Sequence, residues 1–163
     1  MTTQNPTFHL HPIGYARQTE MGCQLEILEA FRPALKQLDQ FSHVKVYWWA
    51  DQNDTPEMRS KLQTELPYAP GVTAGVFACR AEYRPNPIAE TISFILDVDE
   101  QNGILTLPWI DAFDGTPLLD LKPYIPMSDR VRDINVPEWL EMLPECMEDA
   151  AEFFAGEGAG FFE

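Results

Sequence analysis

Two proline-rich segments limit the fold of this chain more than any other feature. The first is Arg84-Pro85-Asn86-Pro87, and the second runs from Asp114 to Tyr124, with prolines at positions 117 and 123. Each proline fixes its own φ, removes a backbone donor and pushes the preceding residue toward extended geometry. Residues 84–87 therefore cannot form a central strand, whereas Asp114-Gly115-Thr116-Pro117 has the composition of a turn. We expect two rigid corners that hold the backbone still around something small and polar.

Short segments that alternate in polarity, or are rich in β-branched and aromatic residues, predict strands. They are residues 8–17, with an interruption near residues 12–14, and residues 24–28, 43–50, 73–79, 90–97 and 104–110. The last two are joined through Asn102-Gly103, a strong hairpin signal. Their spacing predicts a mainly β chain that forms a small, closed or nearly closed antiparallel β-barrel. A Rossmann fold is excluded because no G-x-G-x-x-G follows a strand.

Helices are expected only around these strands. One short helix is predicted over residues 33–40. A second should begin at Thr55, whose hydroxyl caps a helix with proline in its first turn, and run to about Glu65. A third is predicted over residues 137–154, with an apolar stripe and a break at Pro144.

The predicted organisation is a single domain. A barrel covers residues 7–130, and a C-terminal helical extension with a flexible tail covers residues 131–163. In that tail, Phe161-Phe162 could dock on a partner subunit. Of the neighbouring indoles of Trp48 and Trp49, one must point outward from its strand, where it could stack on a base or line a subunit contact.

The charge balance restricts the partners. The chain has 26 acidic and 11 basic residues and a formal net charge of −15. This sign disfavours nucleic acid and membrane surfaces. Three cysteines without a CxxC favour a reducing, cytoplasmic setting, and no apolar run or signal peptide indicates a membrane location. His9-x-His11 has no third ligand nearby in the sequence, so no metal site is predicted.

Two arginines stand beside the first rigid corner. Arg80 and Arg84 are four residues apart, and paired guanidinium groups next to a fixed loop indicate a bound anionic group. The alternative is that they form surface ion pairs with Glu82 or Glu90. Asn86, fixed between two prolines, aims its amide in one direction, either for binding or to support the loop.

Taken together and in this order, the motifs resemble the TsaA/TrmO-type family over residues from about 8 to 129. The resemblance is carried by these segments: Ile13-Gly14, Phe41-Ser42-His43, residues 75–80, residues 84–88 and residues 114–126. It implies a small β-barrel that binds S-adenosylmethionine, often as a homodimer with the site near the subunit boundary. It also implies methylation of the N6 nitrogen of threonylcarbamoyladenosine beside the tRNA anticodon.

The resemblance implies roles for individual residues of this chain. Contacts with S-adenosylmethionine would come from Met21, Gly22, Asp51, Gln52, Arg80, Glu90, Asp114, Gly115, Thr116 and Pro117. Arg80 would hold the cofactor carboxylate. Substrate binding or loop shaping would fall to Arg84, Asn86, Lys122 and Tyr124. No catalytic residue is assigned, and Asp51 and Glu90 are the candidates for a general base.

Three departures from the family pattern leave the acceptor open. Ala89-Glu90 stands where the family has Gly and an apolar residue, Asp51 stands where it usually has His, and the loop over residues 18–22 is short. The first hypothesis is a methyltransferase acting on tRNA, although the net charge disfavours that partner. The second is a methyltransferase of the same fold with a small neutral or cationic acceptor. The third is a non-catalytic module that binds S-adenosylmethionine. A homodimer is expected in each case.

Overall fold

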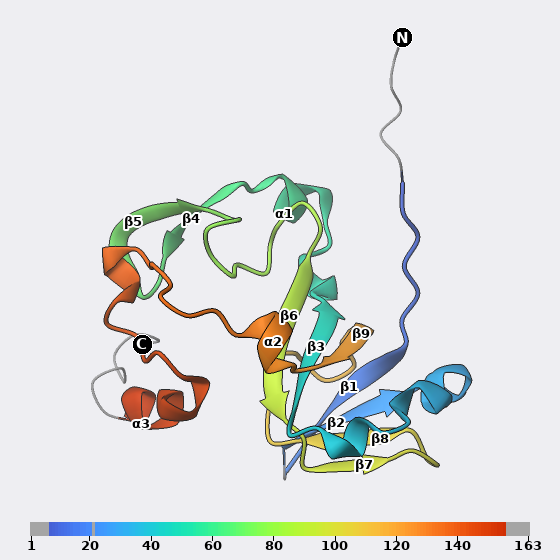
Figure 1. Cartoon of the computed structure of the whole chain (residues 1–163). Coiled ribbons are helices and arrows are strands. Elements are labelled where there is room, and N and C mark those ends of the chain that lie inside the picture. Colours follow the sequence, from blue (N-terminus) through green and yellow to red (C-terminus); the bar gives the residue numbers. More distant parts are fainter. Residues whose placement is uncertain (1–6, 21, 156–163) are drawn as a thin grey trace.

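The computed structural model describes residues 7–20 and 22–155 and is built around one antiparallel sheet (Figure 1). Seven strands lie in the order β6-β3-β9-β1-β2-β8-β7, and β4 and β5 form a separate hairpin. The mainly β prediction is confirmed. The strands are β1 Gly14–Thr19, β2 Gly22–Ile27, β3 His43–Trp49, β4 Gln63–Leu66, β5 Ala69–Gly75, β6 Ile88–Phe94, β7 Asp97–Asp99, β8 Ile104–Leu107 and β9 Pro117–Pro123.

The helices of the described residues are all short. The α-helices are α1 Pro56–Ser60, α2 Pro126–Asp129 and α3 Ala150–Ala155. The 3-10 helices are Glu29–Leu35, Leu38–Gln40, Asp51–Asn53, Glu138–Leu140 and Met147–Asp149. None of the described helices has the length and apolar run that crossing a membrane requires.

The sheet curls toward a barrel without closing. Its two edge strands, β6 and β7, are consecutive in the chain and are joined by only Ile95 and Leu96. The nearest bonds lead to β8 and the residues after it: Leu96 N–H donates to Thr106 O at 2.9 Å, and Ser93 Oγ of β6 donates to Trp109 O at 2.8 Å. Within the described ranges no ladder joins the two edges, so the expected closed barrel is not found.

The core lies inside this curl. Alternation along β3 buries Val44, Val46 and Trp48, and Leu25 and Leu105 face them from β2 and β8 with no exposed surface on the two leucines. Burying each such leucine stabilises the fold by roughly 1.5–3 kcal/mol. One indole points inward and one outward, as predicted. Trp48 is buried in the core, whereas Trp49 is half-buried and its Nε1–H donates to Asp54 at 3.0 Å.

Several element boundaries differ from the predictions. The first strand starts at Gly14 rather than residue 8, because Pro12 cannot donate to a ladder. Thr55 caps α1, accepting from the N–H of Met58 as predicted, but α1 ends at Ser60 rather than Glu65. The residues that follow pair as a hairpin instead, and β5 covers residues 69–75 rather than 73–79.

Other predicted elements are shorter or differently connected. The residues predicted as one helix over 33–40 form two 3-10 helices, Glu29–Leu35 and Leu38–Gln40. The turn at residues 100–103 joins β7 to β8, not β6 to β8. In the C-terminal segment, helical structure is limited to two 3-10 turns and α3, because Pro144 interrupts the helical hydrogen bonds. The predicted flexible tail and Phe161-Phe162 lie outside the described residues.

Strand β9 is absent from the predictions but is central in the sheet. Its prolines stand only at its first and last positions. It pairs with β3 over most of its length and with β1 through Pro117 and Leu118. The prediction that residues 84–87 form no central strand is confirmed, since β6 begins only after Pro87.

Gly14 provides a test of the packing between β1 and β2. A Cβ at this position would lie 2.2 Å from the Glu26 carbonyl oxygen, whereas one at Gly75 would lie 3.8 Å from its nearest neighbour, Leu62 O. We expect Gly14→Ala to lower the free energy of unfolding by about 2–3 kcal/mol, because backbone must move. Gly75→Ala should change it by less than about 0.5 kcal/mol. Urea denaturation measures both, and equal values would contradict the packing described.

Candidate functional site

The register of β3 brings three loops to one end of the sheet. Trp49, the last residue of β3, pairs with Ile88, the first residue of β6, and Trp48 pairs with Leu118 near the start of β9. Because both ladders are antiparallel, the residues after β3 meet those before β6 and those before β9. The bond from Ala50 N–H to Pro87 O, at 2.8 Å, fixes the first of these junctions.

A cavity of about 310 Å³ lies at this junction. Its walls come from the 3-10 helix Asp51–Asn53, from the segment before β9, and from Glu82 and Gln18. Four acidic side chains line it, and its lining contains no lysine or arginine; the acids are Asp51, Glu82, Asp111 and Asp114. This composition favours a ligand that carries positive charge.

The turn before β9 is tied to the end of β1. Thr116 N–H donates to Phe113 O at 3.2 Å, and Gly115 has a φ of +81°, which is why glycine suits this third turn position. The Asp114 carboxylate accepts from Gln18 N–H at 3.0 Å, and Gly115 N–H donates to Ala16 O at 2.8 Å. These bonds hold the turn against the cavity in a fixed position.

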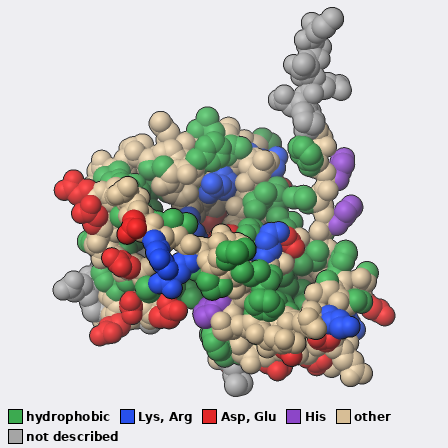
Figure 2. Space-filling model, in the orientation of Figure 1, with side chains coloured by type: hydrophobic (Ala, Val, Ile, Leu, Met, Phe, Trp, Pro, Cys, Tyr) green, Lys and Arg blue, Asp and Glu red, His purple; other side chains and the backbone are tan. Residues whose placement is uncertain are grey.

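A larger groove of about 770 Å³ adjoins this cavity. Its floor is the outer face of β3 and β6, including Tyr47 and Glu90, and its opposite wall is the loop carrying Phe77, Arg80 and Arg84. Cavity and groove share the following lining residues: Trp48, Glu82, Trp109 and Asp111. The two proline-braced corners therefore border neighbouring parts of one depression, which Figure 2 shows as a hollow in the molecular surface.

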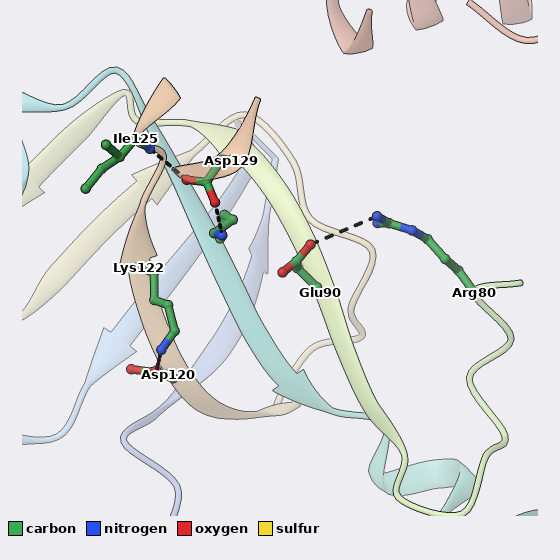
Figure 3. A network of polar contacts seen from close by, with 7 residues as sticks. Arg80, Glu90, Asp120, Lys122, Ile125 and Asp129 are labelled. Carbon is green, nitrogen blue, oxygen red and sulfur yellow. Dashed lines mark hydrogen bonds and ion pairs between the residues drawn. The ribbon is translucent and has the colours of Figure 1, made fainter. Parts of the chain in front are cut away.

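A line of polar contacts crosses the floor of the groove and the neighbouring strand β9 (Figure 3). Arg80 Nη2 reaches across the groove to Glu90 Oε1 at 4.0 Å. Tyr47 pairs with Glu90 across the strands, and burial together with hydrogen bonding to Glu90 raises the pKa of the Tyr47 phenol. On β9, Lys122 Nζ donates to Asp120 at 2.5 Å and lies 5.4 Å from the centre of the Tyr47 ring.

Helix α2 is tied to β3 by the ion pair between Lys45 and Asp129, whose side chains are 17% and 12% exposed. The Lys45 hydrogen bond, followed by that from Ile125 N–H, holds the pKa of Asp129 below its ordinary value. The same bond raises the pKa of Lys45. The pair fixes the connection that leads from the sheet into the C-terminal segment.

The structure brings some of the sequence-predicted residues together. Asp51, Gln52, Asp114 and Thr116 line the smaller cavity, while Arg80, Arg84 and Glu90 line the larger groove. Gly115 and Pro117 are next to Thr116 in the chain and do not line either space. Arg80 shows the alternative foreseen from the sequence, an exposed ion pair with Glu90.

Other predicted residues have local structural contacts. Arg84 Nη1 donates to Ala81 O at 3.2 Å within its own loop, and Asn86 Oδ1 accepts from Arg59 at 3.5 Å, so both shape the corner. Tyr124 N–H donates to His43 O at 3.0 Å, and Tyr124, like Lys122, does not line the groove.

The two residues predicted from the loop after β1 are not assigned to the site. Gly22 has a φ of +129° and stands against Leu107 O, where a Cβ would approach to 2.5 Å, so a packing constraint accounts for it. Met21 lies outside the described residues. Among the residues that are described, no cluster of three or more His, Cys, Asp or Glu side chains could hold a metal ion.

Sequence reasoning missed three residues of the site. Trp109 and Phe113 are 59% and 60% exposed although they border the cavity, and Gln18 lines it from the end of β1. The signal available for Trp109 and Phe113 was a pair of large aromatic residues in a segment that ends in a rigid turn. For Gln18, only the pairing of β1 with β9 reveals the contact.

Comparison with known proteins identifies the family. A family model described as "tRNA-methyltransferase O N-terminal domain" matches residues 3–130. The chain belongs to this family. The resemblance inferred from the motifs is thereby confirmed.

Individual members of the tRNA-methyltransferase O family agree with this assignment. A protein of Pyrococcus abyssi, named "Probable S-adenosyl-L-methionine-binding protein", is 34% identical over 143 residues, which cover 86% of this chain and 72% of that protein. The Homo sapiens protein named "tRNA (adenine(37)-N6)-methyltransferase" is 36% identical over 104 residues, 64% of this chain and 23% of that protein. The crystal structure of TrmO from Pseudomonas aeruginosa aligns with a TM-score of 0.64 and 32% identity, covering 83% of this chain and 63% of that one.

The ion pair between Lys45 and Asp129 in this family member predicts a pH dependence. A carboxyl group whose pKa is lowered by folding stabilises the native state above its ordinary pKa of 3.8, and that stabilisation is lost as the pH falls through the lower, folded value. Asp129→Asn should therefore be less stable than wild type at neutral pH, and the difference should shrink below about pH 4. Thermal melts across the pH range measure this difference, with Asp39→Asn as an exposed control. A difference that stays constant with pH would contradict the assignment.

Proposed function

We propose that this chain is a methyltransferase that uses S-adenosylmethionine, and that the smaller cavity and the adjoining part of the groove receive this methyl donor. The observation that carries the proposal is the meeting of Asp51-Gln52, the Arg80 loop and the Asp114–Thr116 turn around one depression. These are the residues to which the family resemblance assigns donor binding. They come from three separate parts of the chain, and the sheet register explains why they converge.

The charges of the depression fit the charges of this donor. S-adenosylmethionine carries a sulfonium and an ammonium group, and the acidic lining of the smaller cavity suits both. Its carboxylate needs a cationic partner, which Arg80 offers from the groove once it leaves Glu90. The exposed rings of Trp109 and Phe113 offer faces on which an adenine can stack.

The chemistry requires little covalent participation by the protein. When bound, S-adenosylmethionine supplies a methyl group that is already activated by the sulfonium. The groove aligns an acceptor nitrogen with it and excludes water. Glu90, on the floor of the groove, is placed to accept the proton that the nitrogen loses. Asp51, in the smaller cavity, is the other candidate base.

For the acceptor, we propose the N6 nitrogen of a modified adenosine in tRNA, in a homodimeric and cytoplasmic enzyme. The names of two relatives, the Mus musculus and Homo sapiens proteins that are 35% and 36% identical to this chain, support this choice. A second candidate, a small neutral or cationic acceptor, is favoured by the net charge of −15 and by the acidic walls of the cavity. A non-catalytic binding module would use the same cavity without transfer.

Calorimetric titration tests donor binding. We expect wild type to bind S-adenosylmethionine, and Arg80→Ala to bind it roughly ten- to a hundredfold more weakly, because a charge-assisted hydrogen bond to the carboxylate is lost. Arg132→Ala, an exposed arginine outside the family match, makes the same change in net charge and should bind as wild type does. Absence of binding by wild type would overturn the proposal, whereas unchanged affinity in Arg80→Ala would remove only the role of that residue.

Transfer of labelled methyl groups tests the acceptor. Total tRNA from a strain that lacks only this N6-methylation should become labelled on the modified adenosine when it is incubated with the protein and the labelled donor. If tRNA stays unlabelled while the donor binds, the assignment of tRNA as acceptor is wrong. Label on a small amine or a free nucleoside would then favour the second candidate, and the absence of any turnover would favour the binding module.

A further inference from the structure

Three residues from three neighbouring strands stand side by side on the outer face of the sheet. Glu90 of β6 pairs with Tyr47 of β3, and Tyr47 pairs in turn with Asp120 of β9. Directly opposite residues of an antiparallel pair point to the same face, with Cβ atoms about 4.5–5.5 Å apart. Because the adjacent Trp48 is buried in the core, Tyr47 and Glu90 point outward, where both line the larger groove.

Glu90 has two polar neighbours of different kinds in this groove. Arg80 Nη2 lies 4.0 Å from Glu90 Oε1, and the Arg80 side chain is 81% exposed, so this ion pair is weak. In the proposed function Arg80 also leaves Glu90 to bind the carboxylate of the methyl donor. Figure 3 shows Arg80 reaching toward Glu90 from a separate loop, whereas Glu90 stands on a strand that lies beside β3. Tyr47 of β3 is therefore the neighbour that stays in place when the donor binds.

The environment of Tyr47 keeps its phenol protonated. Burial raises the pKa of this phenol, hydrogen bonding to Glu90 raises it further, and Lys45 acts in the opposite direction. Lys45 itself forms an ion pair with Asp129. A protonated phenol donates a hydrogen bond to a carboxylate, and charge-assisted bonds of this kind are roughly twice as strong as bonds between neutral groups.

The carboxylate on the other side of Tyr47 is already engaged. Asp120 accepts a hydrogen bond from Lys122 Nζ at 2.5 Å and another from Leu121 N–H at 2.9 Å. Asp120 also does not line the groove, in contrast to Glu90. Glu90 is therefore the carboxylate that Tyr47 can orient toward a molecule bound in the groove.

We propose that Tyr47 is a positioning residue that holds the carboxylate of Glu90 toward the acceptor in the groove. The proposal rests on the proposed function, in which Glu90 takes the proton of the acceptor nitrogen. In the transfer, this nitrogen bonds to the methyl carbon, and the bond between carbon and sulfur breaks with its electron pair left on sulfur. The N–H proton passes to Glu90, and the phenol of Tyr47 keeps its own proton throughout.

A double-mutant cycle on methyl transfer, with the tRNA described above as acceptor, tests this role. Glu90→Gln should lower kcat about a hundredfold, and Tyr47→Phe should lower it about tenfold because a hydrogen bond to a charged group is lost. KM for the acceptor and Kd for the donor should stay close to the wild-type values. In the Glu90→Gln background, Tyr47→Phe should have no further effect, because the carboxylate that it positions is absent.

Tyr15→Phe is the matched control for this cycle. Tyr15 is half-buried like Tyr47, but it lies on β1 and lines neither the cavity nor the groove. This variant should keep the kcat of wild type.

The outcomes separate the positioning role from the proposed function. An equal loss of kcat from Tyr47→Phe in both backgrounds would indicate a structural role and overturn the positioning proposal, as would full activity in Glu90→Gln. The proposed function would survive either result, since wild type would still transfer methyl groups. Absence of transfer by wild type would overturn the proposed acceptor chemistry and the positioning role with it.

The titration of the Tyr47 phenol gives a readout that does not depend on activity. Protein labelled with 13C at the Cζ atoms of tyrosine is followed by NMR from about pH 8 to 11, around the ordinary pKa of a phenol. The Tyr47 signal is assigned by its loss in Tyr47→Phe. In Glu90→Gln this phenol should lose its proton at a lower pH than in wild type, because the carboxylate that raises its pKa is absent. An unchanged titration in Glu90→Gln would overturn the contact and the positioning role, whichever acceptor the protein uses.

Discussion

The pairing of β3 with β6 on one side and β9 on the other is the constraint on which the site depends. Both partners begin where β3 ends, so the Pro-Asn-Pro corner, the Asp-Gly-Thr-Pro turn and the 3-10 helix after β3 must share one end of the sheet. A shift of the register by one residue would turn Trp48 outward and Tyr47 into the core. The indole of Trp48, bonded to Thr91 Oγ1 at 3.1 Å, locks that register from inside.

Rigid backbone and charged side chains have separate tasks in this arrangement. The prolines and the positive-φ glycine fix where the loops lie, and the bonds from Asp114 and Gly115 to β1 hold the turn. The acids then give the smaller cavity one sign of charge, while Arg80 and Glu90 face each other across the groove. A zwitterionic ligand with two cationic groups and one carboxylate matches this division. Met147 of the acidic C-terminal segment also lines that groove.

Local sequence patterns predicted the features that are decided locally. The strand over residues 43–50, the Thr55 cap and the turn at residues 114–117 were each predicted from a few adjacent residues. The strand and the cap have the expected structure, and the turn forms one residue earlier, with Thr116 N–H bonded to Phe113 O and a positive φ at Gly115. Strand β9 was missed because two prolines and two charged residues in seven positions are not typical of an inner strand. The contact of Tyr47 with Glu90, and that of Gln18 with Asp114, depend on strand register between distant segments, which no local pattern encodes. The helix expected after residue 137 is reduced to short helical pieces on either side of the predicted break at Pro144. Its Trp139 contacts Tyr68 of the hairpin, a tertiary contact that periodicity does not encode.

The most direct test of this account is where the methyl donor contacts the protein in solution. Amide chemical shifts of isotope-labelled protein can be followed while S-adenosylmethionine is added. The account predicts that the largest changes fall together on the segments 50–53, 80–84 and 111–116, most of whose residues line the cavity or the groove. Changes confined to residues 29–40 and 97–103, around the 3-10 helices and β7, would contradict it, because no loop of the proposed site lies there.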